Sequence, residues 1–110
     1  MSYRQIDAAK VPAVLAALKA GRTRIEDIKH WGQRYNVQTT AAGETRYCAL
    51  GAIPDTAPYA TRGVLTDASY VLYGKDVVRV NDRRGKRAEV HAKVLLVYDD
   101  AIAYVEGLVT

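Results

Sequence analysis

The sequence has a single cysteine, Cys48, and its two histidines, His30 and His91, lie far apart along the chain. One thiol cannot form an intramolecular disulfide, and no group of cysteine and histidine residues has the spacing of metal ligands. We therefore expect no disulfide, no metal and no cofactor. The fold has to depend on packing alone, as in a reducing cytoplasm.

Long apolar stretches are also missing. No apolar run approaches the roughly 20 residues that a membrane-spanning helix needs. Residues 1–10 lack the apolar core of a signal peptide. The glycines are isolated, so the sequence contains no glycine-rich phosphate loop. These absences predict a cytoplasmic protein that does not bind membranes.

The size and composition are those of one domain. With 110 residues and an apolar fraction of 49%, the chain can bury a single core, and we expect one domain over residues 1–110. Apolar residues at three-and-four spacing predict a first helix over residues 8–20, with Pro12 in its first turn and Gly21 after its end.

The next segment predicts a second helix and then a hairpin. Thr23 and Glu26 have the spacing of a capping box, so the second helix should start at Arg24 and bury Trp31. Residues 35–47 contain two β-branched stretches around a turn, which predicts a short hairpin.

The second half of the chain is predicted to be mainly helical. Residues 48–53 should form a brief helix, residues 59–73 a third helix that Gly74 ends, residues 77–80 an extended piece, and residues 81–85 a polar loop. The strongest helical pattern comes last, in the stripe Val90, Val94, Val97, Ala101, Val105 and Leu108. The fold class is therefore mainly α (α+β), with three to four helices, a short β-hairpin, and a long C-terminal helix packed across the core.

These elements carry a resemblance to a known family. The pattern consists of Trp31, Gly43, residues 48–52 with the sequence CALGA, Asn81-Asp82, Glu89-Val90 and Ala101-Ile102. It resembles a small domain of unknown function from actinobacteria and their phages, with the motif W…G…C-A-L-G-A…W-N-D…E-V…A-I. Val80 stands where that family usually has tryptophan, and Lys86 where a threonine often caps the last helix. The resemblance implies a mainly helical fold and no particular activity.

Cys48 has two interpretations. An exposed thiol at a helix start would be a nucleophile, with His91 or His30 as base and Asp82 or Asn81 as the group that orients it. A buried thiol would be a small apolar residue. We favour burial, because the small residues that follow Cys48, among them Gly51, allow another element to approach closely. The sequence thus identifies no catalytic residue, and a Cys48-dependent enzyme is the second alternative function.

Asn81 and Asp82 form a polar pair before the last helix. A carboxylate and a carboxamide can share a cation, but one carboxylate is too few for a dedicated metal site. We expect one of the two side chains to bond neighbouring backbone amides in an Asx-turn. Trp31, Cys48, Gly51, Asn81 and Asp82 are therefore predicted to be structural residues.

Positive charge is concentrated in one segment. The chain has a net charge of +4, and Arg79, Arg83, Arg84, Lys86 and Arg87 lie on or near the loop before the last helix. Positive charge is unfavourable at a helix N-terminus, so local stability does not explain this run. We expect these five residues to bind phosphates or an acidic protein surface. Arg22, Arg24, Lys29 and Arg34 would extend the patch if the second helix lies beside the loop. A solvated loop is the alternative interpretation.

Eight tyrosines and no phenylalanine suggest either a recognition surface or half-buried rings with solvated hydroxyls. The function that the sequence favours is a small, non-enzymatic binding or accessory protein of phage or bacterial type. It would contact an acidic protein partner through a basic, tyrosine-rich surface. Nucleic acid is the alternative partner, bound through its phosphates by the tip at Arg83 to Arg87, and self-association is a further prediction.

Overall fold

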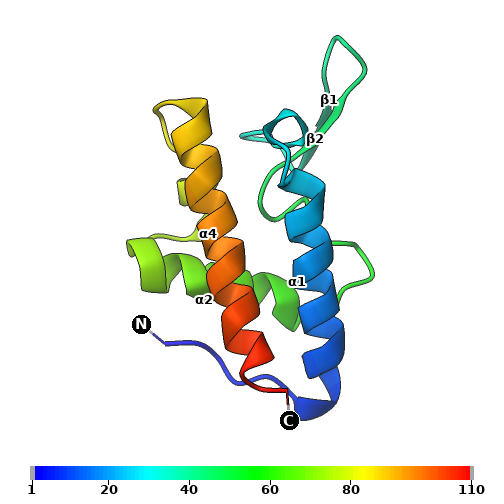
Figure 1. The fold of residues 1–110 in the computed structure, drawn as a ribbon, viewed down its shortest axis with the longest axis vertical. Coiled ribbons are helices and arrows are strands. Elements are labelled where there is room, and N and C mark those ends of the chain that lie inside the picture. Colours follow the sequence, from blue (N-terminus) through cyan, green and yellow to red (C-terminus); the bar gives the residue numbers. More distant parts are fainter. Residues whose placement is uncertain (1, 110) are drawn as a thin grey trace.

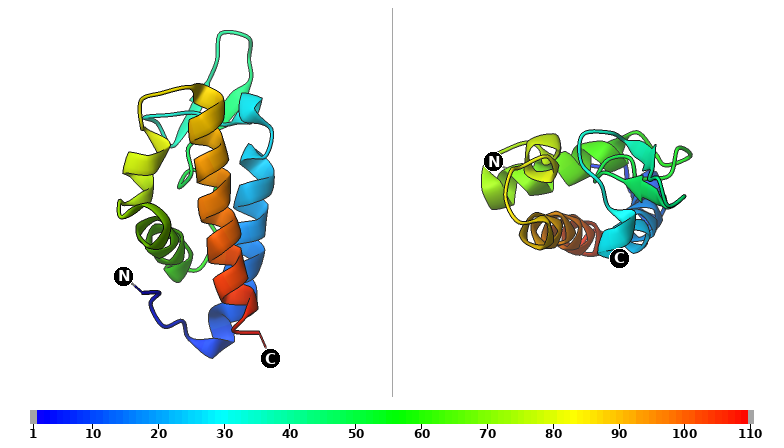
Figure 2. Two further views of the ribbon diagram at one scale, coloured as in Figure 1. Left: turned by 60° about the vertical axis from the view of Figure 1, so that its left-hand side comes forward. Right: turned by 90° about the horizontal axis from the view of Figure 1, so that it is seen from above.

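The computed structural model describes residues 2–109 and has the mainly helical fold with a short hairpin that the sequence predicts. Helices α1 and α4 run side by side, and α2 crosses behind them (Figures 1 and 2). The elements in chain order are the 3-10 turn η1 (Ala8–Lys10), α1 (Val11–Ile25), the 3-10 turn η2 (Ile28–His30), β1 (Val37–Thr39), β2 (Thr45–Tyr47), α2 (Ala60–Tyr73), α3 (Val77–Asn81) and α4 (Arg87–Glu106).

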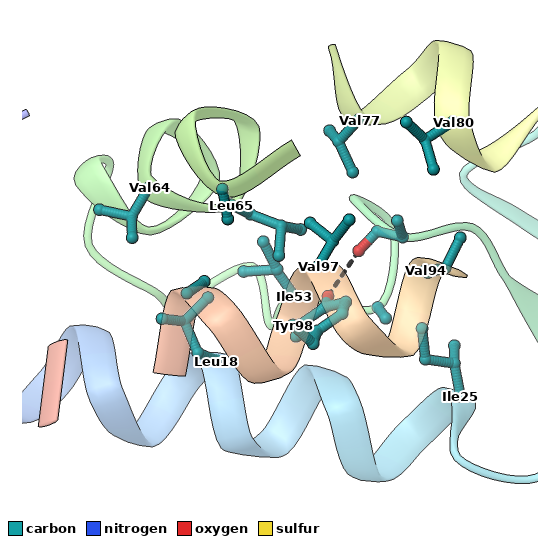
Figure 3. Close-up of a cluster of buried hydrophobic side chains, with 14 of the residues drawn as sticks. Leu18, Ile25, Ile53, Val64, Leu65, Val77, Val80, Val94, Val97 and Tyr98 are labelled. Atoms are coloured by element: carbon teal, nitrogen blue, oxygen red, sulfur yellow. Dashed lines mark hydrogen bonds between the residues drawn. The ribbon is translucent and has the colours of Figure 1, made fainter. Parts of the chain in front are cut away.

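The core lies where the four helices meet. Figure 3 shows Leu18 and Ile25 of α1, Leu65 of α2 and Val97 of α4 in this cluster, with Val77 and Val80 of α3 at one side. Full burial of one such side chain contributes about 1.5–3 kcal/mol. The stripe on α4 is buried as predicted at its first five positions, but Leu108 lies beyond the end of the helix and is partly exposed. The burial of this stripe explains why α4 packs against α1, α2 and α3.

Helix α1 passes through Gly21, where the sequence predicted its end. A Cβ atom on Gly21 would lie 2.7 Å from the hydroxyl oxygen of Tyr98. Tyr98 is fully buried, and its hydroxyl donates a 2.5 Å hydrogen bond to the carbonyl of Ala49. Burial raises the pKa of this phenol far above its ordinary value. Gly21 therefore makes room for a core tyrosine and does not terminate the helix.

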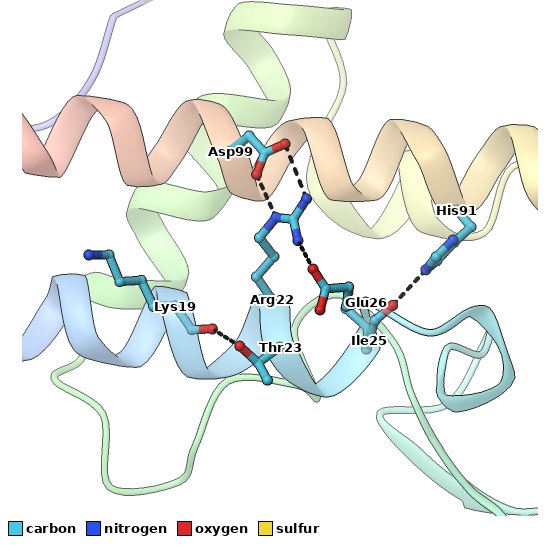
Figure 4. A network of polar contacts seen from close by, with 7 residues as sticks. All are labelled: Lys19, Arg22, Thr23, Ile25, Glu26, His91 and Asp99. Atoms are coloured by element: carbon cyan, nitrogen blue, oxygen red, sulfur yellow. Dashed lines mark hydrogen bonds and ion pairs between the residues drawn. The ribbon is translucent and has the colours of Figure 1, made fainter.

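The predicted capping box was wrong, because no second helix starts at Arg24. The hydroxyl of Thr23 donates to the carbonyl of Lys19 inside α1, as a threonine in a helix interior does. Glu26 instead accepts a 2.9 Å hydrogen bond from Arg22, whose guanidinium also reaches Asp99 on α4 (Figure 4). These side chains join α1 to α4.

Two further predictions fail in the second half. Residues 77–80 are helical, not extended, because Asp76 caps α3: its carboxylate accepts a 2.9 Å hydrogen bond from the amide of Arg79. Residues 48–53 form hydrogen-bonded turns, not a helix. The hairpin and the end of α2 at Gly74 are confirmed.

The N-terminal segment lies across α2 and α4. The ring of Tyr3 stacks on Tyr104 with centroids 4.0 Å apart, and the Tyr3 hydroxyl donates to Asp100. The guanidinium of Arg4 makes two hydrogen bonds to the carboxylate of Asp67, and the Arg4 amide makes a third. These contacts fasten the start of the described chain to two helices.

Candidate binding surface

The loop that carries most of the predicted site residues is held in place by Asn81. This side chain is 1% exposed. Its Oδ1 accepts hydrogen bonds from Trp31 Nε1 (2.7 Å) and the amide of Ala49 (2.9 Å), and its Nδ2 donates to the carbonyl of Gly32 (3.1 Å) and to Asp82 (3.0 Å). The predicted Asx-turn was therefore wrong for Asn81, which cross-links distant segments.

Asp82 also links two segments that are distant in sequence. Its Oδ1 accepts a 2.8 Å hydrogen bond from the amide of Arg34. Arg34 has a φ of 76°, the one positive φ recorded for a non-glycine residue over residues 2–109. The side chain of Gln33 adds 2.9 Å bonds to the carbonyls of Asn81 and Arg83. Residues 33–34 and 81–83 are therefore fixed beside each other, and Arg34 joins the basic loop.

The basic loop presents three of its predicted cations freely. Arg83, Arg84 and Lys86 are exposed, and none forms an ion pair with any part of the chain that the structure describes. Arg34 is also exposed and has no ion pair with those residues. We call these four cations, Arg34, Arg83, Arg84 and Lys86, the basic end.

Arg87 differs from its neighbours because it is used inside the fold. Its Nη2 donates to the carbonyls of Ile28 (2.7 Å) and Trp31, and its guanidinium lies 4.8 Å from the centre of the Trp31 ring. Burial lowers the pKa of Arg87, and the nearby charge of Arg46 lowers it further. Arg87 thus holds η2 against the start of α4.

Two other predicted cations also have internal contacts. The guanidinium of Arg24 lies 5.0 Å from the centre of the Tyr47 ring and donates to the carbonyl of Ala52 at 3.4 Å. Arg79 is exposed and forms a loose ion pair with Asp76, 3.7 Å long. Arg24 and Arg79 are therefore less available to a binding partner than the four cations of the basic end.

The basic loop, η2 and the hairpin gather at one end of the molecule. Figures 1 and 2 both show the loop before α4, in yellow, at the same end as the cyan turn and the green hairpin. Tyr35 follows Arg34 directly and is 64% exposed, and Val37 is 53% exposed. Cationic, aromatic and apolar groups are therefore available on neighbouring surfaces.

Cys48 lies beneath this region and is 8% exposed. Its thiol donates to Asn36 Oδ1 at 3.5 Å and accepts from the amide of Gly51 at 3.3 Å. A small pocket of about 40 Å³ beside it is lined by Cys48, Asn36, Arg34 and Asp82, among others. This volume is far below the roughly 300–1,000 Å³ of typical small-molecule sites.

Neither histidine is a partner of the Cys48 sulfur. His91 Nε2 donates to the carbonyl of Ile25 at 2.6 Å, at the end of α1 (Figure 4), and His30 Nδ1 lies 3.2 Å from the carbonyl of Thr45. Over residues 2–109 no three His, Cys, Asp or Glu side chains are placed to hold a metal ion. In the same range, every helix is too short or too polar to cross a membrane.

Comparisons of the chain with protein-family models, with curated proteins and with solved structures give no match. The resemblance to an actinobacterial and phage domain therefore stays a prediction. The residues that sequence reasoning missed are Gln33 and Asn36, whereas Arg34 was predicted as one of four possible extensions of the basic patch. Their roles depend on contacts with residues 48–83, and polar residues in an irregular segment carry no periodic signal.

Proposed function

We propose that the protein is a small non-enzymatic accessory protein that binds an acidic surface of a protein partner through its basic end. The observation that carries the proposal is the convergence of Arg34 with Arg83, Arg84 and Lys86, all exposed and without ion pairs to residues 2–109. The fold holds them together through Asp82 and Gln33. Unneutralised cations fixed on one surface favour an anionic partner.

The surroundings of these cations favour protein over nucleic acid. A surface that follows a phosphate backbone is mainly positive, whereas Asp82 and Glu89 are exposed on the loop and at the start of α4. Exposed Tyr35 and Val37 add an aromatic and an apolar group. Tyrosine and arginine are enriched in protein interfaces, so an exposed tyrosine beside exposed arginines favours a protein partner.

The phage or bacterial setting is part of the proposal and is supported by the family resemblance alone. A nucleic-acid partner is the second candidate function, and the free cations of the basic end are the observation that favours it. A Cys48-dependent enzyme has less support, since the sulfur is buried and bonded to Asn36 and Gly51.

The proposal is tested by charge reversal and affinity capture. Tagged wild-type protein and the double variant Arg83→Glu/Arg84→Glu are used to capture partners, which are identified by mass spectrometry. The control is Lys10→Glu/Lys19→Glu, which changes the net charge equally at exposed positions of η1 and α1. We expect an acidic partner that the wild type and the control retain and the arginine variant loses. Equal capture by all three proteins would contradict the proposal.

A gel-shift assay with duplex DNA and with RNA at about 50 and 200 mM salt addresses the second candidate. Binding through six or more phosphates would weaken by roughly 1,000-fold or more over this range. Steeply salt-dependent binding that is lost in Arg83→Glu/Arg84→Glu would favour nucleic acid. We expect no shift at either salt concentration.

A further inference from the structure

The hairpin has one free edge, and the pairing register identifies it. Gln38 pairs with Arg46, and the carbonyl of Asn36 accepts a hydrogen bond from the amide of Cys48. In an antiparallel pair these hydrogen-bonded positions alternate with positions whose amide and carbonyl point away from the partner strand. Val37 and Thr39 are in the second class, so their backbone groups point to the outer side of β1.

The corresponding edge of β2 is covered. The amide of Gly32 donates a 3.0 Å hydrogen bond to the carbonyl of Tyr47, and Trp31 forms a parallel bridge with the same residue. The ring of His30 contacts the carbonyl of Thr45. The outward carbonyls of Thr45 and Tyr47 therefore have partners in the segment around η2.

The outward amides and carbonyls of β1 have no such partners among residues 2–109. Among residues 2–109 no hydrogen bond reaches the outward amide or carbonyl of Val37 or Thr39, and both residues are exposed. Natural proteins protect free strand edges because such edges pair readily with other extended chains. Here the hairpin projects from the helical body (Figure 1).

Cations lie on both faces of the hairpin, over the neighbouring strand β2. On one face Val37 is opposite Tyr47, and Arg24 stacks on that tyrosine. On the other face Arg46 is opposite Gln38, and both side chains lie over Gly32. Arg34 comes three residues before the strand. An added strand would direct alternate side chains to these two faces, so acidic residues on it would share a face with Arg24 or with Arg46, whose Nε also donates to the carbonyl of Lys29 at 3.3 Å.

We propose that the free edge of β1 binds an extended acidic segment of the partner protein, which adds a third strand to the hairpin. This inference rests on the proposed function, because it specifies how the acidic partner is recognised. Backbone hydrogen bonds to Val37 and Thr39 supply the pairing, and the cations supply the preference for acidic residues. Exposed Val37 gives the segment an apolar contact beside Tyr47.

The probe is a synthetic peptide, acetyl-Thr-Glu-Val-Glu-Val-Glu-Thr-amide, titrated into uniformly ¹⁵N-labelled protein. We expect chemical-shift changes at the amides of Val37 and Thr39, and slower hydrogen exchange of these two amides in the complex. The same peptide with lysine in place of glutamate should bind at least about tenfold more weakly. Equal binding of the two peptides would contradict the choice of an acidic partner.

Two substitutions at Thr39 separate edge pairing from side-chain effects. Thr39→Pro removes the outward amide but none of the bonds between β1 and β2, and proline is tolerated on edge strands. Thr39→Val keeps the amide. We expect roughly tenfold weaker peptide binding for Thr39→Pro and little change for Thr39→Val. Unchanged cross-strand contacts in the spectra confirm that each variant keeps the hairpin.

The remaining outcomes distinguish this inference from the proposed function. Shifts confined to the loop of Arg83 and Arg84 would leave acidic binding intact and overturn strand addition. A peptide that causes no shift anywhere would contradict both. Concentration-dependent shifts at Val37 and Thr39 without peptide would identify a second copy as the occupant. Stronger shifts with a single-stranded oligonucleotide would identify nucleic acid, and either result overturns the proposal.

Discussion

The indole of Trp31 and the carboxamide of Asn81, fifty residues apart in sequence, share a buried 2.7 Å hydrogen bond. Asn81 uses all four of its hydrogen-bonding positions, and three of its partners lie in residues 31–49. Such a bond contributes more when both groups are removed from water, because neither has another partner. The position of the basic loop relative to Arg34 therefore depends on Asn81, a buried residue that is not part of the basic end.

Asn81→Ala should be strongly destabilising. The substitution leaves the indole N–H of Trp31 and the amide of Ala49 buried without acceptors, and each unsatisfied group costs about 1–3 kcal/mol. We expect the free energy of unfolding, measured by urea denaturation, to fall by about 2–4 kcal/mol. Asn36→Ala is the matched control, since Asn36 is exposed and its side chain contacts the Cys48 thiol. It should lose less than about 0.5 kcal/mol, and equal losses for the two variants would contradict the assignment.

Gly51→Ala should also destabilise the protein, for a steric reason. A Cβ atom on Gly51 would lie 1.9 Å from the backbone oxygen of Asn36, which is itself bonded to the amide of Cys48. The backbone has to move, and such overpacking costs about 1–3 kcal/mol. Thermal and urea unfolding measure the loss. Gly107→Ala is the control, because the nearest atom to its Cβ would be 3.3 Å away. A Gly51→Ala protein as stable as that control would show that the two backbones are not in contact.

Local pattern predicted much of the fold. The stripe on α4, the hairpin near residues 35–47 and the end of α2 at Gly74 follow from periodicity and turn chemistry, which act over a few residues. The errors share a cause. Gly21 was interpreted as a helix end, but the contact that requires glycine is Tyr98, on a helix 77 residues later. No local rule contains that information.

The candidate surface was predicted only in part, because it too depends on contacts between residues far apart in sequence. A basic run is visible in sequence, so Arg83, Arg84 and Lys86 could be selected from composition. Arg87 belongs to the same run, yet its guanidinium is used by the carbonyls of Ile28 and Trp31. Arg34 joins the surface through its backbone amide and Asp82. Which cations are free is decided by tertiary contacts, and a charge count cannot show it.

The contact between the N-terminal segment and α2 should make stability depend on pH. Burial by itself would raise the pKa of Asp67, but the hydrogen bonds and charge of Arg4 outweigh it, so the pKa of this carboxyl is lowered in the folded protein. A carboxyl with a lowered folded-state pKa stabilises the fold above its unfolded pKa of about 3.9. That stabilisation is lost as the pH falls below this value and through the folded-state pKa.

Asp67→Asn removes the charge and should therefore lower the free energy of unfolding at pH 7 by up to about 1 kcal/mol, the usual range for a partly exposed ion pair. The difference from wild type should shrink as the pH falls below about 4. Urea unfolding of both proteins at a series of pH values measures it. Asp55→Asn serves as the control, because Asp55 is exposed and has no ion pair or side-chain hydrogen bond among residues 2–109. A difference for Asp67→Asn that grows towards acid pH would mean that the carboxylate is not stabilised by Arg4, and that other contacts hold the N-terminal segment.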